Sequence, residues 1–223
     1  MAVRSHVSNA VQDYAKAIWS LGQRADEPVS TSALAERLEV SPASASAMVK
    51  RLESMGLVEH EPYHGVKLTP AGERVALEVL RHHRLLELYL AEALGMSWDR
   101  VHEEAEVLEH AISPALSELI AAKLGNPTHD PHGDPIPTAD GEIDEAPTTA
   151  LADLEPGASG VFVRMSDSDP DMLRYLADRG IAPGDRFEVL EREPFGGPLT
   201  VVFGGRAHVL GGALTQAMRT VAR

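Results

Sequence analysis

A tight break at Ser41-Pro42 constrains the fold of this chain more than any other feature of its sequence. Serine is a preferred N-cap residue and proline suits the first helical position, so a helix is expected to begin at Pro42. This helix should run to about Met55, where Gly56 ends it. The break therefore predicts two short helices joined by a tight turn.

The segments around this break complete a known pattern. Residues 8–22 and 29–39 carry apolar side chains at helical spacing, which predicts two helices before the turn. Residues 57–60 and 66–68 alternate as short strands around a Gly-containing turn. Helices, turn and hairpin in this order predict a winged helix-turn-helix.

The helix after the break carries short and cationic side chains. Small residues let a helix backbone enter the major groove, where hydroxyl groups reach base edges and cations reach phosphates. A short helix of small residues could also serve only for packing. The residues expected to contact DNA are Ser41, Pro42, Ser44, Ser46, Lys50 and Arg51.

After residue 68 the sequence pattern changes from helical to irregular and then to short strands. Residues 69–94 and 97–124 predict long helices, the second with a break near Ser113-Pro114. A stretch rich in Pro, Gly and Asp then predicts a segment without regular structure, and short strand patterns around a helix at 169–179 predict a small β-barrel. The expected organisation is a DNA-binding domain (1–75), a helical dimerisation and metal-binding domain (76–125), a flexible linker (126–149) and a barrel domain (150–223).

Composition excludes several classes of protein. The chain has no cysteine, which excludes disulfides, zinc ribbons, iron–sulfur clusters and thiol catalysis. Neither a membrane-spanning run nor a secretory signal is visible, so a cytoplasmic protein without a membrane partner is expected. The net charge is −14, and residues 76–223 carry 25 acidic against 12 basic side chains. Such acidity is typical of a solvated surface, or of carboxylates gathered around a cation.

Two expected helices carry histidines and carboxylates at helical spacing. His83 and Glu87 share one face, and His102 lies on one face of the next helix with Glu106, Glu109 and His110. Imidazole nitrogen and carboxylate oxygen are suitable ligands for a divalent first-row metal. Solvated helix faces are the ordinary alternative. An enzyme site built from His83, Glu87 and His102 is a further alternative, although no nucleophile or phosphate-binding loop accompanies these residues.

The chain resembles the diphtheria toxin repressor family of metal-dependent transcription regulators along nearly all of its length. The most specific similarity lies in the stretches His83-Arg84-Leu85-Leu86-Glu87 and Val101-His102-Glu103-Glu104-Ala105-Glu106-Val107-Leu108-Glu109-His110. Further similarity lies in Leu68-Thr69-Pro70-Ala71-Gly72 and in the tail segment Phe195-Gly196-Gly197-Pro198-Leu199. The resemblance implies a winged helix-turn-helix, a helical domain and a C-terminal SH3-like (FeoA-like) barrel.

The resemblance also implies two metal sites. The primary site would use Asp13, Glu106, Glu109 and His110. The ancillary site would use His83, Glu87 and His102, with a ligand from the SH3-like domain, for which Asp167 is the best candidate. Some family members add ligands after the long helices, and Asp130 and His132 match those positions loosely.

The metal implied by the resemblance is manganese. The iron-responsive branch places a methionine and a cysteine where this chain has Asp13 and Glu106, and hard carboxylate oxygen shifts preference toward Mn²⁺. The second acid of two-domain manganese regulators is Lys16 here, so a separate ancillary site fits better than a closely spaced metal pair. The resemblance therefore implies a homodimeric, manganese-dependent repressor of palindromic operator DNA, and no enzymatic activity. Fe²⁺ or an organic effector remains the alternative, and the tail could also bind a protein partner.

Overall fold

The computed structural model describes residues 7–25, 28–61 and 64–222. The chain divides into two compact units, which we describe separately. The first contains residues 1–82 and 137–142, and the second contains residues 83–136 and 143–223. Among the described residues, no helix is both long enough and apolar enough to cross a membrane.

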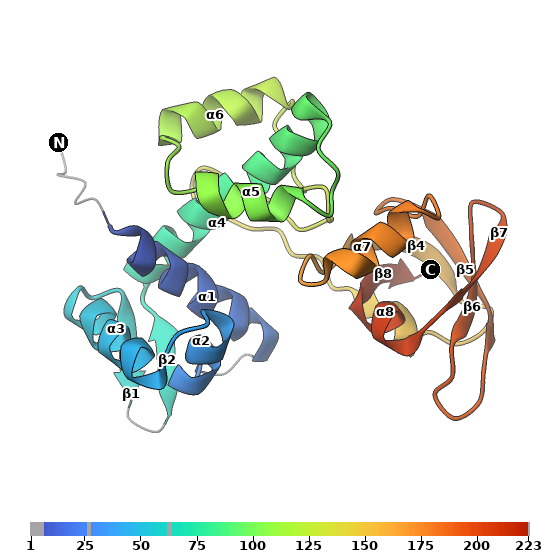
Figure 1. The fold of residues 1–223 in the computed structure, drawn as a ribbon, viewed down its shortest axis with the longest axis horizontal. Coiled ribbons are helices and arrows are strands. Elements are labelled where there is room, and N and C mark those ends of the chain that lie inside the picture. The colour runs from blue at the N-terminus through green and yellow to red at the C-terminus, as the bar shows by residue number, and fades with distance from the viewer. Residues whose placement is uncertain (1–6, 26–27, 62–63, 223) are drawn as a thin grey trace. The chain divides into compact units, whose positions relative to one another are not determined.

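The first unit is a winged helix-turn-helix, as the sequence predicted (Figure 1). Ser30 and Ser41 accept the backbone N–H groups of Ala33 and Ser44, so both helices around the turn begin with a hydrogen-bonded cap. Gly22 was expected to end the first helix but lies inside it. The elements are α1 (Asn9–Ala25), α2 (Thr31–Arg37), α3 (Pro42–Ser54), β1 (Val58–Glu61) and β2 (Gly65–Leu68).

One apolar core holds these elements together. Ala45, Val49 and Leu52 are buried at helical spacing on α3, and they pack with Leu34 of α2 and Val66 of β2. The opposite side of α3 is thereby left in solvent. The core fixes α3 as the exposed helix of the helix-turn-helix.

The long helix α4 (Pro70–Leu94) passes from the first unit into the second. The expected helix over 97–124 is two helices, α5 (Val101–Leu108) and α6 (Pro114–Lys123). Ser113 accepts the N–H of Leu116 and Pro114 takes the first helical position, so this pair starts a new helix instead of bending an old one.

The segment after α6 lacks helices and strands from residue 126 to 148, as its composition predicted. It is nevertheless packed, because Asp130, His132 and Ile136 are buried. Arg84 of α4 donates to the carbonyl oxygen of Pro135 and to Asp134. These contacts hold residues 130–136 against α4, where a free linker was expected.

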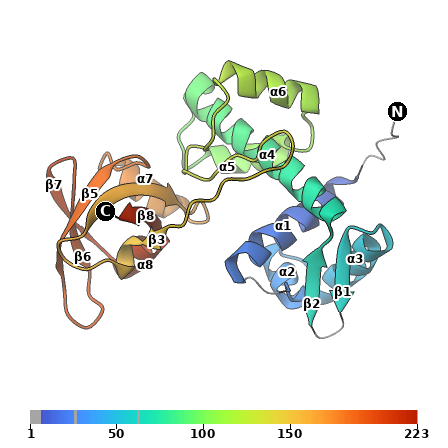
Figure 2. The same cartoon turned by 180° about the vertical axis from the view of Figure 1, so that it is seen from behind.

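The C-terminal part of the second unit is an antiparallel six-stranded sheet with strand order β3-β8-β4-β5-β6-β7. Figure 2 shows the curved strands with α7 and α8 beside them. Leu173 and Leu176 of α7 pack among the strand residues of this core. Sequence patterns missed α8 and β8 because neither has a clear apolar period. The elements are β3 (Thr149–Ala150), a 3-10 turn (Leu151–Asp153), β4 (Ser159–Met165), α7 (Pro170–Ala177), β5 (Arg186–Arg192), β6 (Leu199–Phe203), β7 (Arg206–Leu210), α8 (Gly212–Ala217) and β8 (Met218–Ala222).

Candidate metal centre and DNA-binding helix

The second unit brings four of the sequence-predicted ligands into one group. His83 and Glu87 lie one turn apart on α4 and are buried, and His102 lies on α5. Glu87 Oε1 is 3.0 Å from His83 Nε2 and 3.2 Å from His102 Nδ1. Asp167 Oδ2 is 3.0 Å from the same His102 nitrogen. One ligand atom from each of the four residues lies within 4.8 Å of the others.

Asp167 reaches this group from the loop between β4 and α7. The loop ends at Asp169, whose side chain caps α7 by accepting the N–H groups of Asp171 and Met172. This cap fixes where the loop turns into the helix. The structure thus brings the Asp167 carboxylate of the C-terminal domain beside His102.

Opposite charges stabilise the ionised forms within this group. Burial alone would raise the pKa of Glu87, but the neighbouring histidines lower it well below its usual value. Burial would lower the pKa of His102, yet hydrogen bonds and charge from Asp167 and Glu87 raise it to about 10. Burial would likewise raise the pKa of Asp167, but His102 lowers it to about 2. The positive charge of protonated histidines thus compensates the negative charge of the carboxylates in the absence of a bound cation.

A second group lies on the other side of the His83 ring. His83 Nδ1 is 2.5 Å from Glu109 Oε2 and 3.9 Å from Glu106 Oε1. Glu109 is buried just after α5, and its Oε1 is 3.5 Å from His110 Nε2. Three predicted primary ligands therefore lie together in the second unit, with His83 beside them. Asp13 lies on α1 of the first unit and is half-buried, so its part in a site remains a prediction from the sequence.

A third group places Asp130 and His132 beside Glu87, with all three residues buried. Asp130 Oδ1 accepts the backbone N–H groups of His132 and Asp134, which closes the turn that carries both side chains. Burial raises the pKa of Asp130 well above its usual value, and the charges of Asp134 and Glu87 add to the rise. These two residues match the family only loosely in sequence, because an irregular segment has no period that shows which side chains point inward.

The donor set fits a divalent cation. Nitrogen and oxygen atoms from several chain segments converge in a largely buried place, which is the environment that Mn²⁺, Fe²⁺ or Zn²⁺ accepts. His132 Nδ1 is buried, lies 3.8 Å from Glu87 Oε1 and has no hydrogen-bond partner among the described residues. Burial lowers the pKa of His132, but Glu87 and Asp130 raise it to about 9. A cation bound here would displace protons from the histidines.

The expected DNA contacts lie on one element of the first unit. All six residues are solvent-exposed on α3 or on its cap. Ser41 also caps α3, because its hydroxyl accepts the N–H of Ser44 and lies 2.9 Å from the Ser44 hydroxyl. Lys50 and Arg51 are exposed at the C-terminal half of the helix. The face of α3 opposite the core thus presents short side chains first and cations afterwards.

Known protein families match the three parts of the chain. Residues 6–66 match the family described as "Iron dependent repressor, N-terminal DNA binding domain". Residues 69–138 match "Iron dependent repressor, metal binding and dimerisation domain", and residues 149–218 match the FeoA domain. The order of these matches follows the order of the elements in the structure.

Individual relatives cover almost the whole chain. The iron-dependent repressor IdeR of Mycobacterium tuberculosis is 33% identical over 208 residues, which are 88% of this chain and 89% of the relative. The diphtheria toxin repressor of Corynebacterium diphtheriae is 30% identical, over 86% of this chain and 88% of the relative. A solved manganese-dependent transcriptional repressor in complex with manganese is 45% identical, with a TM-score of 0.88, over 96% of this chain and 100% of that chain.

Proposed function

Because this chain belongs to the diphtheria toxin repressor family of metal-dependent DNA-binding repressors, we propose that it represses manganese homeostasis genes with Mn²⁺ as co-repressor. The members of this family are transcriptional repressors and not enzymes. The observation that carries the proposal is the buried group of nitrogen and oxygen donors around Glu87. Relatives named for iron and for manganese both match this chain, so the choice of metal rests on the ligands.

Two features favour manganese over iron. The residues in the proposed sites offer only nitrogen and oxygen atoms, and carboxylates predominate in the proposed primary site, which suits Mn²⁺. The solved repressor in complex with manganese is 45% identical, whereas the iron-dependent repressor of M. tuberculosis is 33% identical. An iron-dependent repressor of the same architecture is the alternative.

We assign the ligands as the sequence resemblance implies. The primary site would consist of Asp13, Glu106, Glu109 and His110. The ancillary site would consist of His83, Glu87, His102 and Asp167, with Asp130 and His132 next to it. His83, Glu87, His102 and Asp167 lie close together, and Asp130 and His132 lie beside Glu87, which supports the second assignment.

The proposed response to metal follows from the charges of these residues. Asp13, Glu106 and Glu109 repel one another when ionised and close together. A bound cation would supply the positive charge that lets them approach. Asp13 would then fix α1, which contributes Val11, Tyr14 and Ile18 to the core of the DNA-binding unit. The equilibrium between DNA-binding and non-binding conformations would shift accordingly.

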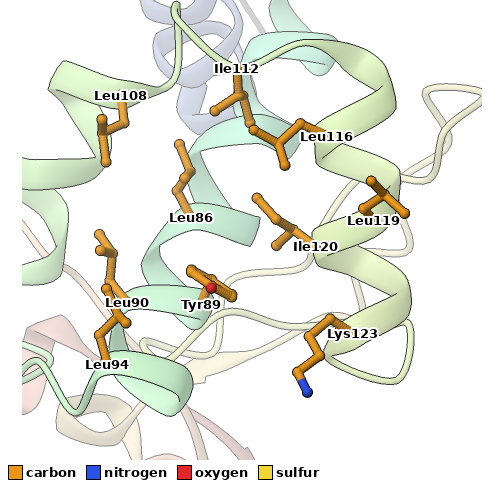
Figure 3. Close-up of a pocket in the computed structure, with 10 residues that line it drawn as sticks. All are labelled: Leu86, Tyr89, Leu90, Leu94, Leu108, Ile112, Leu116, Leu119, Ile120 and Lys123. Atoms are coloured by element: carbon orange, nitrogen blue, oxygen red, sulfur yellow. The ribbon is translucent and has the colours of Figure 1, made fainter.

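An apolar groove of about 470 Å³ on the helices of the second unit supports a homodimer (Figure 3). Leu94, Leu116 and Leu119 are exposed there, with Leu119 at 68%. Exposed apolar side chains at this density are typical of a protein interface, and the domain matched by residues 69–138 is described as a dimerisation domain. The groove is lined by Leu86, Tyr89, Leu90, Leu94, Leu108, Ile112, Leu116, Leu119, Ile120 and Lys123. A homodimer carries two α3 helices, one for each half-site of a palindromic operator.

Selection of genomic DNA fragments on the purified protein tests the proposed function. The selection is run in parallel with Mn²⁺, with Fe²⁺ under anoxia, and with a chelator. We expect one palindromic sequence to be enriched with Mn²⁺ and lost with the chelator. Stronger enrichment with Fe²⁺ would establish the iron alternative. Equal enrichment in all three, or none in any, would contradict a metal co-repressor.

Removing the cations of α3 tests the DNA-binding face. Lys50→Ala and Arg51→Ala should weaken binding by similar factors at specific and unrelated sequences, because a cation on a phosphate reads no base. Each lost phosphate contact should reduce the slope of log affinity against log salt by about 1. Electrophoretic mobility shifts at several salt concentrations measure both quantities. Arg186→Ala, an exposed arginine of β5, is the matched control, and an equal effect of this control would contradict the assignment to α3.

A further inference from the structure

Trp98 lies in the turn between α4 and α5, where it meets His132 and the C-terminal core. Its indole ring is stacked on the His132 imidazole, with the ring centroids 5.9 Å apart and the planes 20° from parallel. The side chain is half-buried and packs against the apolar core of the C-terminal sheet. Trp98 is not among the site residues that the sequence predicted.

The backbone of Trp98 fixes the orientation of the same imidazole. His132 Nε2 is 2.7 Å from the Trp98 carbonyl oxygen. A carbonyl can only accept, so Nε2 must carry the proton in this hydrogen bond. The other ring nitrogen, Nδ1, is therefore the atom left to face Glu87 Oε1 at 3.8 Å. It is buried and has no hydrogen-bond partner among the residues that the structure describes.

We propose that Trp98 is the positioning residue of His132, holding its imidazole so that Nδ1 is available to a divalent cation beside Glu87. This inference rests on the proposed function, because it assumes that the Glu87 group binds metal. The carbonyl decides which nitrogen carries the proton, and the indole decides the plane of the ring. Partners that orient a ligand in this way change metal affinity by about 10–100-fold when they are lost.

The same turn is tied to the C-terminal domain. Asp99 follows Trp98 and accepts from Arg174 of α7 at 3.1 Å. The backbone N–H of Met165, at the end of β4, donates to the carbonyl oxygen of His132. Trp98 thus holds His132 from a turn that the C-terminal domain itself supports. The orientation of the His132 imidazole consequently depends on the packing of the C-terminal domain.

Two substitutions in the full-length protein test the proposal. Trp98→Leu keeps apolar bulk but removes the ring, and Trp98→Phe keeps a ring that can stack. We expect Trp98→Leu to weaken Zn²⁺ and Mn²⁺ binding at this site by about 10-fold or more in calorimetry. Trp98→Phe should restore affinity to within about threefold. With Zn²⁺ as a diamagnetic probe, nitrogen NMR of the native protein should show His132 bound through Nδ1 and protonated at Nε2.

Leu154→Ala separates positioning from packing. Leu154 is also a half-buried residue against the C-terminal core, so this control should lower the unfolding temperature and leave metal affinity unchanged. An equal loss of affinity in Leu154→Ala, unchanged affinity in Trp98→Leu, or binding through Nε2 would overturn the proposal. Intact metal affinity in His132→Gln would also overturn the proposal, because His132 would then not be a ligand. Failure of the proposed function gives a different result, because the native protein would then bind neither metal.

Discussion

Glu87→Gln is expected to abolish metal binding at the buried group while leaving the fold in place. The substitution keeps the size of the side chain and removes one ionised oxygen. Glu87 Oε1 lies within 3.8 Å of three histidine nitrogens, so an ion bound to any of these histidines would lie beside this carboxylate. The loss should exceed the ~10–100-fold cost of removing a residue that only orients a ligand. Calorimetric titration with Mn²⁺ measures it.

Glu92→Gln is the matched control for this experiment. Glu92 lies on the same helix, five residues on, and is exposed to solvent. The Glu92→Gln variant should bind metal and DNA as the native protein does. Retention of full Mn²⁺ affinity by Glu87→Gln would remove the buried group from the mechanism and leave metal sensing to the proposed primary site.

Leu119→Asp is expected to convert the protein into a monomer that binds operator DNA weakly. Leu119 is 68% exposed in the described chain, so the substitution costs the isolated subunit little. A symmetric dimer would bury two copies of the new carboxylate, and an unpaired buried charge costs several kcal/mol. The dissociation constant of the dimer should rise by roughly 1,000-fold or more. Sedimentation equilibrium measures the change.

Val209→Asp provides the comparison for the dimer experiment. Val209 is 61% exposed on β7 and lies outside the groove. It tests whether a new surface carboxylate alone disturbs assembly. If Leu119→Asp remained a dimer, or if both variants dissociated equally, the groove could not be the dimer interface.

The sequence predicted the elements whose signals are local. Ser41-Pro42 predicted the start of α3, because capping and the geometry of proline act within one turn. Ser113-Pro114 predicted only a break in one helix, although the same two effects start α6 there. His83 and Glu87 could be paired from their spacing alone, since residues four apart share a helix face. Asp167 needed the family resemblance as well, because no spacing links a loop to a distant helix.

The rest of the site depends on packing between segments far apart in the chain. Asp130 and His132 lie among prolines and glycines that predicted a flexible linker, yet Arg84 and Glu87 on α4 hold this segment in a buried position. Trp98 falls within the helix expected over 97–124, whereas α5 begins only at Val101. These residues acquire their neighbours only when the chain has folded.

The single oxygen atom Oε1 of Glu87 has a consequence for how many ions the second unit can hold. Histidines from α4, from α5 and from the segment after α6 all approach this one atom. A cation bound to it alongside His83 and His102 would repel a second cation alongside His132. The two places are therefore not independent, and their occupancies should not add as those of separate sites would. A titration of this unit should then show a second ion that binds more weakly than the first.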